Sequence, residues 1–191
     1  MNTFHNKRNV LMFSLLVLLM VACTQNDVDI VKDGTMNGYQ ATTVGAAFDA
    51  SFDNPKWSEF VGEKGKRVVE FSGKITKAVL LDLMGGIAND PNIQHSYAQA
   101  VLSEPEYQQI YEGSSGEGTT PVNEVYRILF DAALRKVVGQ EAVFQWFVTP
   151  DGERFSLAYI DNDVWGPLVR PYGADKNYVY NDEAILNAIY K

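Results

Sequence analysis

The chain has 191 residues, of which 16 are lysine or arginine and 24 are aspartate or glutamate, and its formal net charge is −8. Nucleic acid is not an expected partner, because proteins neutralise its phosphates with clustered basic side chains and this sequence contains no such cluster. The acidic composition also disfavours contact between the protein surface and anionic lipid headgroups.

The first 22 residues have the organisation of an export signal. Lys7 and Arg8 precede an apolar run of 13 residues, 10–22, and no acidic residue occurs before the end of that run. A membrane-spanning helix needs about 20 apolar residues, whereas the apolar region of a signal peptide needs about 7 to 15. The run therefore predicts a cleaved signal peptide over residues 1–22. Its removal leaves 14 basic residues against 24 acidic ones, a net charge of −10.

Cys23, the only cysteine, follows directly on the apolar run in the sequence MVAC. These residues resemble the lipobox of bacterial lipoprotein precursors, although Met20 stands where that pattern usually has leucine. The resemblance implies cleavage after Ala22 and acylation of Cys23, with several acyl chains, because one chain anchors a protein only marginally. The alternative is an ordinary signal peptide that is cut elsewhere. In Gram-negative bacteria of the enteric type, an aspartate directly after the lipidated cysteine retains a lipoprotein in the inner membrane. This sequence has Thr24 at that position, so in such a host the resemblance implies the outer membrane.

The remaining chain is predicted to form a lipidated tether, 23–41, and a single α+β domain, 42–191. Residues 24–41 are polar and contain glycines without a sustained apolar period, which is typical of a linker. The domain is expected to contain an antiparallel sheet of three to four strands, packed by an N-terminal and a C-terminal helix. Residues 77–139 are expected to be a helical insertion between the first and second strands.

The first elements of the domain follow from spacing and capping. Thr42 or Thr43 can cap a helix whose apolar residues run from Val44 to Phe52, and Pro55 ends it, so a second short element begins at Trp57. Residues 67–76 alternate between apolar and polar side chains and predict a strand with one buried face.

Later elements are predicted in the same way. Residues 121–139 have Thr120 as a possible cap and basic residues near the end, which is typical of a helix. Residues 142–149 and 154–160 flank the turn sequence PDGE and predict a hairpin, with Phe155, Leu157 and Tyr159 on one face of its second strand. Residues 181–191 predict a terminal helix that buries Ile185, Leu186 and Ile189.

Several of these segments resemble a group of small, essentially uncharacterised bacterial envelope proteins. The shared pattern is GxAFDxxFxNPKW, found here at 45–57, followed by VVEFxG at 68–73 and an IY ending. The resemblance covers about half of the exported chain and excludes the helical block. It implies a domain type and an exported location, and it supplies no activity or site residues.

The sequence contains no recognisable catalytic or metal-binding constellation. His95 is the only histidine after the signal peptide, and HExxH, paired cysteines and calcium-loop patterns are absent. No cofactor, metal or catalytic residue is therefore assigned. Paired carboxylates remain an alternative, because their proximity in space cannot be read from a sequence.

Exposed aromatic residues are the remaining candidates for function. Trp57 and Trp146 are expected to pack in the core, whereas the Gly- and Pro-containing segment 164–180 is expected to expose aromatic residues beside basic ones. The candidate residues for binding a partner are Trp165, Arg170, Tyr172, Tyr178 and Tyr180.

The favoured function is that of a non-enzymatic envelope lipoprotein that binds another envelope protein, as an assembly accessory, an inhibitor or an exclusion factor. The first alternative is a lipoprotein that binds cell-wall glycan or a small ligand by stacking aromatic rings on it. The second alternative is a carboxylate-based hydrolase. A flat aromatic patch would favour the first function, an aromatic-lined groove the second, and two buried acids across a cleft the third.

Overall fold

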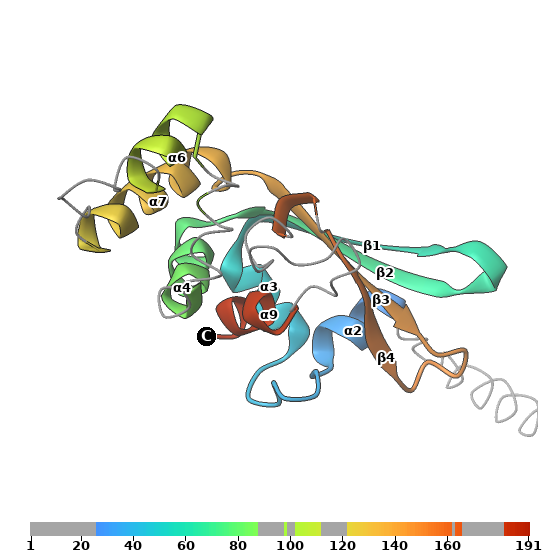
Figure 1. The fold of residues 1–191 in the computed structure, drawn as a ribbon. Helices are drawn as coiled ribbons and strands as arrows, with labels where there is room; N and C mark the ends of the chain where they lie inside the picture. Colours follow the sequence, from blue (N-terminus) through green and yellow to red (C-terminus); the bar gives the residue numbers. More distant parts are fainter. Residues whose placement is uncertain (1–25, 88–97, 99–101, 112–121, 162, 166–181) are drawn as a thin grey trace, which may run out of the picture.

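The computed structural model has an α+β fold, as predicted, built on an antiparallel sheet with the strand order β1-β2-β3-β4 (Figure 1). The structure describes residues 26–87, 98, 102–111, 122–161, 163–165 and 182–191. The strands are β1 (Phe52–Val61), β2 (Arg67–Ile75), β3 (Glu141–Val148) and β4 (Phe155–Ile160). The helices are α2 (Asp27–Asp33), α3 (Val44–Ser51), α4 (Lys77–Ile87), α6 (Glu104–Tyr111), α7 (Val122–Lys136) and α9 (Asp182–Ile189).

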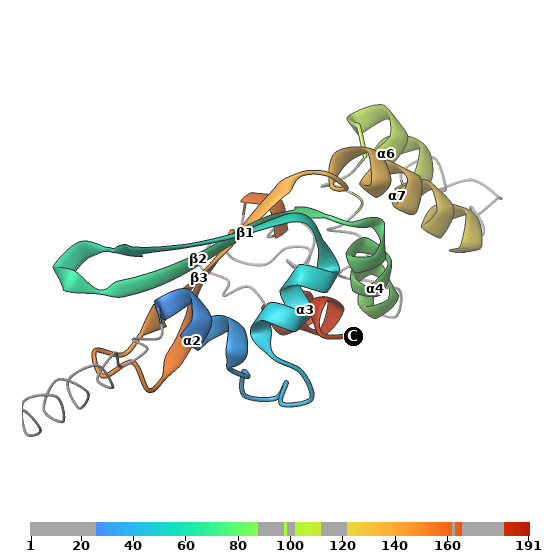
Figure 2. The same ribbon diagram turned by 180° about the vertical axis from the view of Figure 1, so that it is seen from behind.

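One face of the sheet, here called the covered face, carries the large buried side chains of the core. Helices α2, α3 and α9 lie on the same side of the sheet in both views (Figures 1 and 2). Helix α3 places Phe48 over the sheet, and α9 packs against α3 and α4. Helices α6 and α7 lie beyond α4 at one end of the molecule, and the β1–β2 hairpin extends from the opposite end.

The predicted strands with strict alternation are confirmed. Val69, Phe71 and Ile75 of β2 are buried on the covered face, and so are Phe144 and Trp146 of β3. Antiparallel pairing places Phe71 opposite Phe144 and Val69 opposite Trp146, although more than seventy residues separate the members of each pair. Cross-strand pairs of this size stabilise a sheet because their side chains pack directly on one another.

Helix ends also match the prediction where the structure describes them. The hydroxyl of Thr43 accepts a hydrogen bond from the backbone N–H of Ala46, which caps α3. Arg135 and Lys136 occupy the last turn of α7, where positive charge is favourable. Helix α9 buries Ile185, Leu186 and Ile189, as expected. The predicted caps Thr120 and Asn181 lie outside the described residues.

The predicted tether, 23–41, is wrong from Asn26 onward, because the chain joins the folded domain at that residue. Asn26 caps α2 by accepting a hydrogen bond from the N–H of Asp29, and Val31 is completely buried. Seven residues with one buried side chain give too weak an apolar period to be recognised in a sequence. Contacts with distant residues hold this helix in place.

The position of the predicted insertion also changes, because β1 is an additional strand ahead of β2. The helical block 77–139 therefore lies between the second and third strands of the sheet. Its first helix, α4, belongs to the core, since Leu80 and Leu83 are buried and α4 packs against α9. Strands β2 and β3 remain hydrogen-bonded neighbours across the block.

Tyr159 does not lie on the same face of β4 as Phe155 and Leu157, contrary to the prediction. The pairing of β3 with β4 shifts register between Gln145 and Trp146, so Leu157 lies opposite Trp146 while Tyr159 lies opposite Gln145. A bulge of this kind adds one residue to a strand and reverses the faces of the residues beyond it. Tyr159 is consequently 46% exposed, and Ile160 is buried in its place.

Candidate functional site

The candidate residue Trp165 is buried rather than exposed, so its prediction as a partner-binding residue is wrong. Its indole is completely inaccessible and lies against Phe52, 6.5 Å away, and Phe144, 6.3 Å away, between ring centroids. The backbone N–H of Trp165 donates to the carbonyl of Asp161, so a short helical turn directs the ring inward just after β4. Glycine and proline around this residue gave no indication of that packing.

The other predicted site residues lie outside the part of the chain that the structure describes. These residues are Cys23, Arg170, Tyr172, Tyr178 and Tyr180, and His95 lies outside it as well. The lipidation site and the rest of the predicted aromatic surface therefore stay predictions.

The sequence pattern GxAFDxxFxNPKW forms the corner between α3 and β1. Asp49 accepts a hydrogen bond of 2.7 Å from the indole N–H of Trp57 and forms an ion pair of 2.9 Å with Lys32. Asn54 has a positive φ of 53° next to the irregularity that Pro55 introduces in β1. A β-carbon on Gly45 would lie 3.0 Å from Lys32, so glycine allows α2 and α3 to approach closely. In the described structure this motif has a packing role.

Phe48 is the centre of the aromatic core. Its ring centroid lies 5.0 Å from that of Phe71, 5.0 Å from that of Phe144 and 5.2 Å from that of Trp146, in each case in an edge-to-face arrangement. Aromatic pairs prefer this geometry because the positive ring edge meets the negative ring face. Trp57 stacks on Trp146 at 5.6 Å, as expected of core tryptophans.

The opposite side of the sheet, here called the open face, is polar with exposed aromatic residues. Its register rows place Phe60, Val68, Phe147 and Ser156 side by side. Only Val68 among these four is buried, whereas Phe60 and Phe147 are 45% and 37% exposed. Lys66 holds its ammonium 4.2 Å from the ring centroid of Phe147.

A second row of the open face contains Glu70, Gln145 and Tyr159. The side-chain amide of Gln145 donates a hydrogen bond of 2.7 Å to Glu70, and Tyr159 lies opposite Gln145 on the edge strand. Desolvation, and to a smaller extent the nearby carboxylates of Asp161 and Asp163, raise the pKa of the Tyr159 hydroxyl. The phenol is therefore neutral at physiological pH and can donate a hydrogen bond to a bound molecule.

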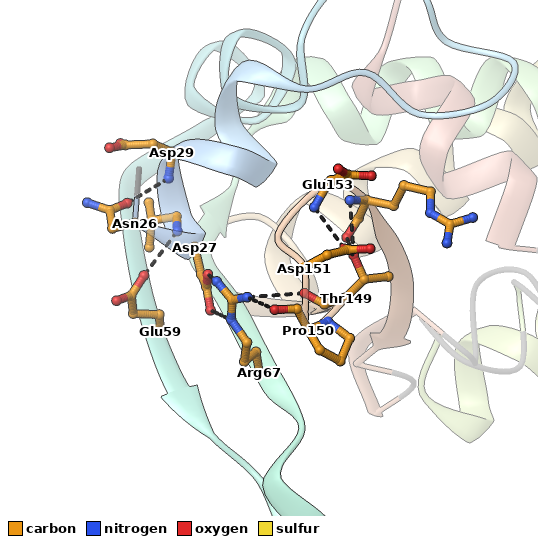
Figure 3. A network of polar contacts seen from close by, with 11 residues as sticks. Asn26, Asp27, Asp29, Glu59, Arg67, Thr149, Pro150, Asp151 and Glu153 are labelled. Atoms are coloured by element: carbon orange, nitrogen blue, oxygen red, sulfur yellow. Dashed lines mark hydrogen bonds and ion pairs between the residues drawn. The ribbon is translucent and has the colours of Figure 1, made fainter. Parts of the chain in front are cut away.

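A polar network at the sheet end next to α2 fixes the start of the domain (Figure 3). Arg67 forms an ion pair with Asp27 of α2 and donates hydrogen bonds of 3.1 Å to the carbonyls of Thr149 and Pro150. The hydrogen bond from Arg67 to Asp27 raises the pKa of the guanidinium further. The backbone N–H of Val28 donates to Glu59 at 3.1 Å. One arginine thus joins α2, β2 and the turn between β3 and β4.

The described residues offer little for acid–base or metal chemistry. They contain no group of three or more histidine, cysteine or acidic side chains that could hold a metal ion, and no buried charged side chain. Desolvation raises the pKa of Asp182, which lines a hollow of about 200 Å³ with residues 157–160, and Asp182 is the one acid among the described residues that line it. A second hollow, of about 300 Å³, lies between residues 37–39 and α9.

None of the described helices has the length and apolar composition needed to cross a lipid bilayer. Comparison with models of protein families finds no matching family, and comparisons with curated proteins and with solved structures find no match. The candidate site is therefore assigned from the residues of this chain alone. The open face is the surface that sequence reasoning missed, and its one signal was Phe147, an aromatic residue on the outward side of an alternating strand.

Proposed function

We propose that the chain is a lipid-anchored, non-enzymatic accessory protein of the bacterial cell envelope, which binds another envelope protein through the open face. The observation that carries the proposal is the exposure of Phe147 and Tyr159 on a sheet whose opposite face is filled by the core. Large aromatic residues with polar neighbours are typical of the centres of protein interfaces. Lipidation of Cys23 and an outer-membrane location are parts of the same proposal.

The shape of the surface favours a protein partner over the two alternatives. A sugar chain would be expected in an aromatic-lined groove, whereas Phe147 lies on an open sheet surface beside the polar Ser156. The hollow that Tyr159 lines contains no second aromatic side chain among the described residues. A hydrolase would place two carboxylates across a cleft, and among the described carboxylates Asp182 alone both lines one of the two hollows and has a raised pKa. The open face therefore supports the first function best.

The anchor is tested by mass spectrometry of the protein extracted from membranes of the native bacterium, beside a Cys23→Ser variant. We expect the native protein to begin at Cys23 and to carry the mass of several acyl chains. The variant should keep its signal peptide or be released without acyl mass. A native protein that begins elsewhere, with an unmodified Cys23, would contradict the anchor.

The binding surface is tested by placing a photo-reactive amino acid at Phe147, at Tyr159 and, as a control, at Leu81. Leu81 is a matched control because its side chain is 44% exposed but belongs to α4. We expect the two open-face positions to crosslink the same envelope protein, and the control position to miss it. Crosslinking from Leu81 alone, or different partners at Phe147 and Tyr159, would contradict the proposed surface.

A further inference from the structure

The distance along the chain between the proposed anchor and the folded domain is very short. Asn26 caps α2, and only Thr24 and Gln25 separate it from Cys23. Three residues of extended chain span at most about 11 Å. If Cys23 carries lipid, as proposed above, the start of α2 must lie close to the membrane surface.

The network around Arg67 then determines which part of the domain lies close to the membrane. Asp27 is bound to Arg67 at the first residue of β2, and Val28 is bound to Glu59 near the end of β1 (Figure 3). Arg67 also binds the carbonyls of Thr149 and Pro150 in the turn before β4. The start of α2 is consequently fixed to the tip end of the β1–β2 hairpin, and it cannot reorient separately from the sheet.

Exposed apolar side chains gather at this same end. Val61 is paired with Arg67 and is 71% exposed, and the adjacent Phe60 is 45% exposed. Phe147 lies in the same register row as Phe60 and is 37% exposed. Three of the five large apolar side chains that are exposed in the described part of the chain therefore lie at the end that the anchor would bring to the membrane.

The charges at this end determine the kind of contact. Beyond the paired Asp27 and Arg67, the basic side chains are Lys64, Lys66 and Arg154, and the acidic ones are Asp29, Glu59, Glu63, Asp151 and Glu153. This balance gives no attraction to anionic headgroups, in agreement with the acidic composition of the chain. Phe60 and Val61 instead suit the apolar boundary of a bilayer, while long lysine side chains can extend to the headgroups.

We infer that the tip of the β1–β2 hairpin, residues 60–66, inserts Phe60 and Val61 into the membrane interface next to the lipid anchor. This inference rests on the proposed lipidation of Cys23 and commits to a lipid surface as the occupant of the tip. The hairpin and the anchor together fix the orientation of the domain. Phe147 lies next to the membrane, and Tyr159 lies farther along the open face.

The test uses the full acylated protein in nanodiscs of phosphatidylethanolamine with an environment-sensitive probe on a single new cysteine. Cys23 is the only native cysteine, and acylation blocks its thiol, so Val61→Cys and the control Leu81→Cys each carry one probe. Spin-labelled lipid with its nitroxide near the headgroup should quench the probe at Val61 several-fold more than the probe at Leu81. Replacing part of the lipid with phosphatidylglycerol should leave this difference unchanged.

The outcomes separate the two proposals. Equal quenching at Val61 and Leu81 in a protein whose acyl mass is confirmed would overturn the membrane contact and leave the anchor intact. A mature protein without acyl chains would overturn the anchor and this inference with it. A probe at Val61 that is exposed in nanodiscs but protected in cells would identify the tip as a protein contact and would also overturn the inference. The unfolding midpoints of both variants serve as the check on folding.

Discussion

The two faces of the sheet use aromatic residues in opposite ways. On the covered face, Phe48, Phe71, Phe144 and Trp146 are completely buried and contact one another. On the open face, Phe60, Phe147 and Tyr159 are between about one third and one half exposed and have polar residues as neighbours. Residue type alone therefore does not distinguish a core aromatic residue from an exposed one in this chain, whereas the face of the strand on which the residue lies does.

The difference follows from the alternation of side chains along β3. Trp146 points to the covered face and Phe147 to the open face, so consecutive aromatic residues belong to different surfaces. Burying a large aromatic side chain stabilises the fold, whereas leaving one in water forgoes that stabilisation unless a partner covers it. The comparison predicts large effects on stability from the first face and large effects on binding from the second.

The largest effect on stability is expected for Phe48→Ala. The side chain is completely buried at the centre of the aromatic core, so its removal leaves a cavity and should lower the free energy of unfolding by about 3 to 5 kcal/mol. Denaturant unfolding followed by tryptophan fluorescence measures this change. A loss below about 1 kcal/mol would show that the core can close around the cavity and that Phe48 is not its centre.

A smaller but clear loss is expected for Arg67→Ala, which breaks the link between α2 and the sheet. The variant leaves Asp27 without its ion pair and removes both hydrogen bonds to the turn before β4. Its unfolding midpoint should fall less than that of Phe48→Ala, and hydrogen exchange should increase in α2. The matched control is Arg154→Ala, which removes an exposed positive charge from the same turn and should change neither quantity.

The sequence was sufficient to predict the strands and helices in which the apolar residues repeat with a strong period. β2, β3 and α9 bury the residues that alternation or helical spacing selects. β1 could not be recognised, because eight of its ten residues are exposed and its extended state depends on pairing with β2. α2 depends on Arg67, which lies 40 residues beyond Asp27.

The candidate site was harder to predict for the same reason. Trp165 was expected at the surface because glycine and proline surround it, but Phe52 and Phe144 from distant strands enclose its ring. Tyr159 was expected on the same strand face as Phe155 and Leu157 because of its spacing from them, but a bulge in the pairing with β3 places it on the opposite face. Both errors concern contacts between segments, and single-sequence periodicity does not contain that information.

Alkaline pH should lower the free energy of unfolding through the buried hydroxyl of Tyr190. Burial raises the pKa of its hydroxyl well above the ordinary value near 10. When the pH exceeds about 10, the unfolded chain therefore loses this proton while the folded chain still holds it. The free energy of unfolding should therefore fall as the pH rises above about 10, by at most about 1.4 kcal/mol per pH unit for this group. Tyr190→Phe should make that fall less steep, and unfolding curves between pH 9 and about pH 11 measure it.

At neutral pH the same substitution should be slightly stabilising. The hydroxyl of Tyr190 is buried and has no hydrogen-bond partner among the described residues, so removing it should raise the free energy of unfolding by about 1 kcal/mol. Tyr39→Phe is the matched control, because the hydroxyl of Tyr39 donates a 2.8 Å hydrogen bond to Asn187. That variant should be neutral or destabilised by up to about 1 kcal/mol, and the opposite order of the two variants would contradict this assignment.

The smallest effect on stability and the largest on binding are expected for Phe147→Thr combined with Tyr159→Thr. Both side chains are exposed on strands, and threonine keeps a high strand propensity, so the free energy of unfolding should change by about 1 kcal/mol or less. Without these rings the open face loses the side chains that we propose as anchors, and crosslinking to the proposed envelope partner from a photo-reactive residue at Gln145 should disappear. Undiminished crosslinking in a folded double variant would mean that the partner binds elsewhere on the domain. Lost crosslinking with unchanged stability would separate the two faces by function, since the covered face cannot lose an aromatic ring without destabilising the fold.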